Sequence, residues 1–439
     1  TFETRLDLSE QEMATLLLQA DYLSRLEREL FVSLVVKSVD KNLLKRQYIE
    51  QKGITARQFN ALRINIEGKV KAWAEIEKNT VSTLLGKVKA TERKIKTLQS
   101  DKAKVLSKAR SKTLSKSKPK SKSNSNSQNK TQAGVKQTVR EQVQRINFVI
   151  HQKKRKLDLL KHRLGIHQAR LTVTPSICFG SRDLFRKQFN LKANGYKTHS
   201  QWLEDWRFAR ANQFLNLGSS DETLGSQTCQ YDPASGTMRI RLAQPCSSLN
   251  GGDRFVTVDG VNFKYGQDKI IAAQANKQAV ATRIVFRKVK NKTIAYALLS
   301  VTETISEVIT SKTNGALGVD LNAKSIAWAQ IGPTGNLYRI DTLPCDLTGL
   351  SSEQAKQVLS LKVIELVDQA KSQRIPIVCE RLDFAEKKKT LGETSAKYAH
   401  MLSGFAYSSF YAALKRRCAR EGAELIEVNP AFTSVFGYI

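Results

Sequence analysis

The chain has 439 residues, of which 41% are hydrophobic, so it is long enough for roughly two to four domains with cores of their own. It carries 72 Lys and Arg against 40 Asp and Glu, a net charge of +32. That excess predicts a polyanionic partner and favours nucleic acid over an anionic membrane surface. No apolar run reaches the length of a membrane span and no signal peptide is evident, so we expect a cytoplasmic protein.

The N-terminal region begins with a strand and continues as helices. Residues 1–8 alternate between apolar and polar side chains, which is typical of a half-buried strand. Ser9 is followed by acids and then by apolar residues at helical spacing to about residue 36, which predicts a helix with Ser9 at its start. Residues 41–78 predict further helix, with breaks at Gly53 and Gly68.

A heptad pattern predicts an antiparallel coiled-coil hairpin in the next region. Apolar residues recur every seven positions in two segments, first Val81, Val88 and Ile95, then Val143, Ile150, Leu157 and Leu164. Residues 106–137 between them are rich in Ser, Lys and Asn, and we expect a disordered loop. The loop is either a solubilising linker or a flexible arm that binds phosphates, because the stretch between Asp101 and Glu141 holds 12 basic residues and no acid.

Residues 171–312 change to a β pattern. Short alternating segments, among them a hairpin around Asn291, predict a small β-barrel or sandwich, and the strand at 1–8 is expected to join it. The segment 176–191 is basic and contains three Phe residues. Arg182 and Arg186 are therefore candidates for contacts with nucleic acid, with the aromatic rings either stacking on bases or packing in the core.

From about residue 313 the pattern predicts an α/β domain. A strand at 318–323 is followed by a hairpin, an amphipathic helix after Ser351, a buried strand ending at Glu380, a basic loop, a helix over 398–421 and a last strand. The six cysteines form no C-x-x-C pair, so no zinc site is predicted, and small buried side chains are the favoured interpretation.

Two acids in this domain point to a metal site. Asp320 lies in the first strand and Glu380 ends a later one, with a helix between them. A crossover connection lays two such strands side by side, so the carboxylates should meet at one end of the sheet. Like charges so close repel unless cations neutralise them, and Mg²⁺ prefers carboxylate oxygens. Together with the charge of +32, the pair predicts metal-dependent cleavage of nucleic acid.

The same residues resemble a known family. "GVDLNAKSIAWAQIGPTG" resembles the first RuvC motif of TnpB-type proteins from bacterial insertion sequences and of their relatives, the type V CRISPR effectors. "IPIVCERLDF" with "AEKKK" resembles their second motif, and "VNPAFTS" the segment that follows. The resemblance covers residues 313–439 by motif and the rest of the chain by arrangement only.

The resemblance implies a multidomain α+β and α/β protein. Its parts would be a β-barrel wedge-like domain (residues 1–10 and 166–312), a helical recognition domain with the coiled-coil hairpin (11–165), and an RNase H-like (RuvC) nuclease domain (313–439) that is incomplete at its C-terminus. The implied function is that of an RNA-guided, Mg²⁺-dependent DNA endonuclease encoded by a transposon, which cleaves DNA next to a short transposon-adjacent motif.

The resemblance also implies the partners and the site. Asp320 and Glu380 would be the first two catalytic ligands of two Mg²⁺ ions, with a guide RNA and a target DNA as partners. The protein would then work in the bacterial cytoplasm, associated with the nucleoid. Lys387, Lys388 and Lys389 in the basic loop would face a nucleic-acid backbone, and otherwise they belong to a solvated loop.

Two features of the family pattern are missing from residues 313–439, namely a third acid after the last strand and a four-cysteine zinc module. Either the chain is a fragment and the third acid follows Ile439, or the protein is a nuclease-dead, RNA-guided DNA-binding protein such as a repressor or targeting subunit. A phosphotransferase of the actin/hexokinase type is less favoured, because no Gly-rich nucleotide loop is evident and a charge of +32 suits it poorly.

Overall fold

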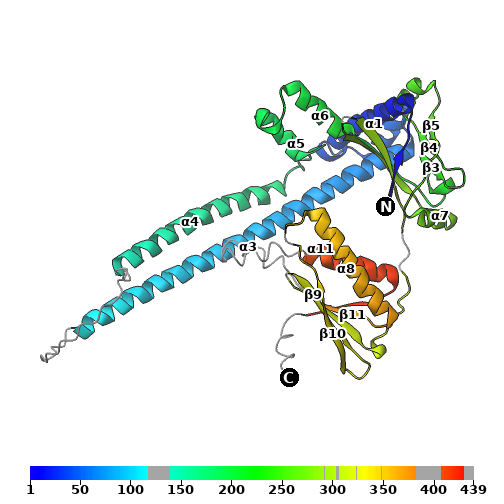
Figure 1. The fold of residues 1–439 in the computed structure, drawn as a ribbon. Coiled ribbons are helices and arrows are strands. Elements are labelled where there is room, and N and C mark those ends of the chain that lie inside the picture. The colour runs from blue at the N-terminus through cyan, green and yellow to red at the C-terminus, as the bar shows by residue number, and fades with distance from the viewer. Residues whose placement is uncertain are drawn as a thin grey trace. The chain divides into compact units, whose positions relative to one another are not determined.

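The computed structural model of the chain describes residues 1–116, 139–290, 292–302, 306–322, 324–347, 349–381 and 407–429. The chain divides into two compact units, one formed by Thr1–Lys78 with Ala169–Glu303 and the other by Asn79–Gln168 with Thr304–Ile439. Figure 1 shows helices and strands in both. The protein therefore has mixed α and β structure, which confirms this part of the predicted fold class.

The first unit contains two antiparallel sheets. One has the strand order β1-β7-β6-β2 and the other β3-β4-β5. The N-terminal strand pairs with β7, which confirms the prediction that it joins the β-rich region. The hairpin predicted around residue 291 is confirmed as β6 and β7. The strands of this unit are β1 (Phe2–Leu6), β2 (Gln213–Asn216), β3 (Cys229–Asp232), β4 (Thr237–Arg241), β5 (Phe255–Val258), β6 (Ala281–Val289) and β7 (Lys292–Ser300).

The helices of the first unit surround one core that they share with both sheets. The main one, α1, starts at a capping box in which Ser9 and Glu12 satisfy each other's backbone N–H groups. Its buried side chains, such as Leu16 and Leu30, pack in the same cluster as Ile240 and Phe286 of the two sheets. The helices are α1 (Glu10–Phe31), α2 (Lys41–Lys52), α5 (Arg182–Lys187), α6 (His199–Ala211) and α7 (Gln267–Ala275), with shorter turns at Val32–Val36, Gln188–Asn190, Lys192–Asn194, Thr223–Gly225 and Gln244–Asn250.

The two predicted glycine breaks have different outcomes. Gly53 ends α2 in a left-handed conformation with φ of 60°, as predicted. Gly68 lies inside α3 (Ala56–Lys116), which runs through it without interruption, so that predicted break is wrong. A glycine in a helix interior costs only about 1 kcal/mol, and the flanking helix formers offset it.

The coiled-coil hairpin is confirmed by the second unit. The part of α3 after Lys78 packs against α4 (Val139–Arg170), and the two helices lie side by side in Figure 1. Their seam contains the predicted heptad residues Val81, Val88, Leu157 and Leu164, together with Leu84 and Leu160.

The prediction starts the disordered loop too early in the sequence. Residues 106–116 are helical and belong to α3, so the prediction is wrong for them, whereas residues 117–138 lie outside the described residues. Lys, Arg, Ala and Leu all favour helix, and a polar helix can therefore extend past the end of the apolar pattern.

The second unit also contains a five-stranded mixed sheet in the order β10-β9-β8-β11-β12. The first three strands form an antiparallel meander, and β11 is parallel to both β8 and β12. The elements are β8 (Ala316–Leu321), β9 (Ser325–Ile331), β10 (Leu337–Pro344), α8 (Ser352–Ser372), β11 (Ile377–Glu380), α11 (Tyr407–Glu421) and β12 (Leu425–Val428), with a short turn at Lys312–Asn314. This is the predicted chain order, and the predicted side-by-side placement of β8 and β11 is confirmed.

A single core holds this sheet against its helices. Leu317 and Ile377 of the central strands pack with Val363 of α8 and with Phe410 and Leu414 of α11. Gly315 precedes β8 with φ of 112°, and a Cβ there would clash with the carbonyl oxygen of Ile331. Glycine therefore allows β8 to begin directly beside the end of β9. No helix among the described residues is both long and apolar enough to cross a membrane.

Candidate functional site

The structure brings the two predicted acids together at one edge of the mixed sheet. β8 and β11 are adjacent and parallel, and their register pairs Val378 with Gly318 and Cys379 with Val319. The same register, continued by one residue, sets Glu380 opposite Asp320. Both acids thus lie at the carboxyl ends of neighbouring parallel strands, where α/β sheets place their ligand-binding side chains.

Asp320 is not a buried charge inside an apolar strand. Leu317, Val319 and Leu321 of β8 are buried, whereas Asp320 lies on the opposite face and is exposed. The alternation of a strand therefore separates the carboxylate from the core that surrounds its neighbours. The core thus covers β8 on one face at this point, and Asp320 lies on the other.

The electrostatics at this edge nevertheless disfavour two free carboxylates. The protein atoms around Asp320 displace part of its water, and this desolvation, followed by the negative charge of Glu380, raises the pKa of the Asp320 carboxyl. A hydrogen bond from the Asn322 side chain acts in the opposite direction and lowers that pKa. A nearby cation would relieve the repulsion between the two acids.

The residues at this edge fit a hard divalent cation. Carboxylate oxygens are the ligands that Mg²⁺ takes, and two acids on adjacent strand ends can bind one ion together. Within the described ranges no cluster of three or more His, Cys, Asp or Glu side chains that could hold a metal ion is found, and Asp320 and Glu380 form a pair of candidate ligands there. Five of the six cysteines are buried, which agrees with their interpretation as small core side chains.

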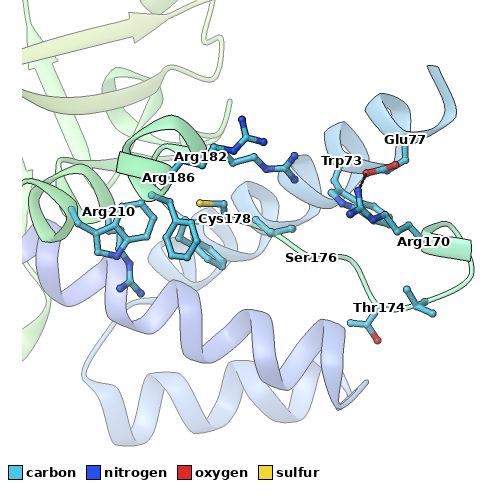
Figure 2. Close-up of a pocket in the computed structure, with 14 residues that line it drawn as sticks. Trp73, Glu77, Arg170, Thr174, Ser176, Cys178, Arg182, Arg186 and Arg210 are labelled. Carbon is cyan, nitrogen blue, oxygen red and sulfur yellow. Dashed lines mark ion pairs between the residues drawn. The ribbon is translucent and has the colours of Figure 1, made fainter. Parts of the chain in front are cut away.

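The other predicted nucleic-acid residues fall into two groups. Lys387, Lys388 and Lys389 lie outside the described residues. Arg182 and Arg186 project from α5 in the first unit and line a cavity of about 670 Å³, which Figure 2 shows. The structure therefore gives these two arginines a defined pocket.

Aromatic side chains accompany the arginines in this pocket. The sequence left the Phe residues open between stacking and core packing. Phe179 is partly buried and packs on the core of the first unit, whereas Phe185 and Phe189 are 43% and 76% exposed. Trp202 and Trp206 are buried and stacked on each other, with ring centroids 5.9 Å apart. The aromatic side chains thus range from buried in the core to largely exposed at the edge of the pocket.

Three further pocket residues were missed by sequence reasoning. Trp73 comes from α3, Arg170 from the end of α4 and Arg210 from α6. These residues lie far apart in sequence, with other helices and loops between them. No local pattern links them, so only the folded chain shows that they share a pocket.

The comparisons add no relative to these observations: no protein-family model matches the sequence, and no curated protein is significantly similar to it.

Proposed function

We propose that this chain is an RNA-guided, Mg²⁺-dependent DNA endonuclease of the TnpB type, encoded by a transposon and directed to DNA next to a short adjacent motif. The observation that carries the proposal is the pair Asp320 and Glu380 on adjacent parallel strands, where desolvation and then the charge of Glu380 raise the pKa of the Asp320 carboxyl. Their positions are those of the first two acids in the motifs that the sequence resembles.

The arrangement of the sheet supports the nuclease part of the proposal. An antiparallel meander of three strands followed by two parallel strands, in the order β10-β9-β8-β11-β12, is the arrangement expected of an RNase H-like domain. Helix α8 connects the meander to β11, and α11 leads into β12. A β-rich wedge domain would correspond to the two sheets of the first unit, and the recognition domain to the helices of residues 11–165, which include the helical hairpin.

The acids have a clear task in this proposal. Mg²⁺ held by Asp320 and Glu380 would supply charge stabilisation at the cleaved phosphodiester and a nucleophilic water. The protein's own contribution is to fix two carboxylates on rigid strands, one of which accepts a hydrogen bond from the Asn322 side chain. Fixed ligands bind in one geometry and lose little entropy when they do so.

The charge of the chain supports the two polyanionic partners. A net charge of +32 suits a guide RNA and a target DNA, whose phosphates bind through release of counterions. Arg182 and Arg186, which line the cavity of the first unit, would make such contacts there, and the basic residues Lys387–Lys389 would add further ones.

The test compares Asp320→Ala with Asp341→Ala in the protein purified with its bound RNA. Asp341 is an exposed acid on β10 of the same sheet, paired with Arg339, and serves as the matched control. We expect Asp320→Ala to abolish Mg²⁺-dependent cleavage of a plasmid library and to leave nucleic-acid affinity within about twofold, because exposed acids contribute little to phosphate binding. Unchanged cleavage by Asp320→Ala would refute the nuclease assignment. Tight RNA-directed DNA binding without cleavage by the unaltered chain would instead identify the nuclease-dead binding protein.

A further inference from the structure

The pocket in the first unit carries more positive charge than its own acids balance. Of the charged residues that line it, Arg170 pairs with Glu77 at 3.6 Å, as the dashed line in Figure 2 marks. Arg186 reaches Asp183 at 3.8 Å, but both side chains are largely exposed, so that pair contributes little. Arg182 forms no ion pair with any described residue.

Arg210 is the most constrained of these cations. Its guanidinium carbon lies 5.6 Å from the centroid of the Trp206 ring, and its Nε atom is buried without a hydrogen-bond acceptor among the described residues. Burial and the nearby charge of Arg210 both lower the pKa of Arg28 on α1. Two cations held together in a partly buried place are stabilised when an anion binds between or beside them.

Aromatic rings form the other wall of the pocket. Phe185 is 43% exposed and lies 5.4 Å from Trp206 and 6.0 Å from Phe189, measured between ring centroids. Because Trp206 is buried, the exposed ring of Phe185 rests on a fixed neighbour and offers a flat surface at low entropic cost. A nucleobase can stack on such a ring, and every base has a suitable face.

A second cavity of about 380 Å³ continues this surface. It shares Trp73, Phe179, Arg182 and Arg210 with the first, and adds Lys69, whose ammonium lies 4.7 Å from the centroid of Phe179. The first cavity alone, at about 670 Å³, lies within the range of about 300–1,000 Å³ that encloses small ligands. It is thus large enough for one nucleotide and open to a continuing chain.

We propose that this pocket binds an unpaired nucleotide of a single-stranded nucleic acid, with the base stacked on Phe185 and the phosphate held by Arg182 and Arg210. Base-paired nucleotides cannot use it, since their faces are already stacked within the duplex. Arg170 keeps its ion pair with Glu77 and forms part of the pocket wall. The proposal rests on the proposed function only in naming a nucleic acid as the partner, because the acids of the mixed sheet take no part in it.

The test measures binding of a fluorescently labelled single strand of about ten nucleotides, as RNA and as DNA, to the full-length protein freed of nucleic acid at high salt. We expect Phe185→Ala to weaken binding about tenfold, the usual consequence of losing one stacked base. Phe148→Ala is the control, because Phe148 is 63% exposed on α4, outside the pocket. Arg182→Gln should weaken binding and lower the slope of log K against log salt by about 1, more than Arg254→Gln at another exposed arginine.

Three outcomes decide the matter. A photo-crosslink from an oligonucleotide with 5-iodouridine to Phe185 or Phe189, lost when an excess of unlabelled single strand competes, supports the pocket, and a preference for RNA or DNA identifies the strand it holds. Equal binding by Phe185→Ala and Phe148→Ala, or a duplex that competes as well as a single strand, overturns it. Asp320→Ala serves as the separating variant: it should bind the oligonucleotide normally, so failure of the nuclease proposal and failure of the pocket are told apart.

Discussion

The acid pair of the second unit and the basic pocket of the first are assembled from the chain in opposite ways. Asp320 lies near the end of β8 and Glu380 ends β11, and a connection through a hairpin and helix α8 lays these two strands side by side, so the meeting of the acids follows from chain order. The pocket instead collects Trp73, Arg170 and Arg210 from three helices. Chemistry at strand ends is therefore accessible to sequence reasoning, whereas a pocket between helices depends on packing that no short pattern records.

The largest expected effect separates chemistry from binding. Glu380→Ala should reduce single-turnover cleavage at saturating nucleic acid by about 10³-fold or more, because it removes one of two carboxylates that would hold the metal. Phe185→Ala and Arg182→Gln should leave that rate within about threefold, since saturation compensates for weaker binding. Glu353→Ala, an exposed acid at the start of α8, is the control. A large rate loss in the pocket variants would show that the two regions are not functionally separate.

The next effect compares a buried and an exposed phenylalanine. Phe410 is 2% exposed in the core under the mixed sheet, and Phe410→Ala should lower the free energy of unfolding of that unit by about 3–5 kcal/mol. Phe185→Ala at the pocket rim should change stability by about 0.5 kcal/mol or less. Hydrogen exchange is the measurement, with faster exchange expected in β8 and β11 but not in β6 and β7. Equal loss in both units would mean that their cores unfold as one.

These contrasts also explain what the sequence could predict. The heptad rows, the N-terminal strand and the order of elements after residue 313 depend on local periodicity, and the structure has them. Gly68 and the start of the basic loop were mispredicted because strong helix formers override a single glycine or a missing apolar stripe. The exposure of Asp320 follows from the alternation of β8, because its apolar neighbours Val319 and Leu321 face the core and Asp320 lies on the opposite face.

A pH titration tests the coupling of the acids directly. The pKa of Asp320 is raised in the folded, metal-free chain, so between its unfolded value of 3.8 and the raised value the folded state binds more protons. Stability from this group is therefore present at low pH and lost as pH rises through the raised pKa. Glu380→Gln should bring that pKa down, as followed by the carboxyl carbon signal in NMR, but less than completely because desolvation is the larger cause. An unchanged titration would show that the two carboxylates do not interact.

The smallest effect concerns Asn322, two residues beyond Asp320. Its side chain donates a hydrogen bond that lowers the pKa of the Asp320 carboxyl, so Asn322→Ala should raise that pKa further. A single hydrogen bond contributes about 1 kcal/mol, which limits the expected change in cleavage to within about tenfold at neutral pH. Asn336→Ala, in the turn between β9 and β10, provides the control, since its amide bonds to Thr334 instead. If the Asp320 signal shifts in Asn322→Ala and not in Asn336→Ala, then a neighbour in sequence tunes the acid pair. Such local tuning is available to a site built on strand ends, whereas the helical pocket collects its cations from the end of α4, from α5 and from α6.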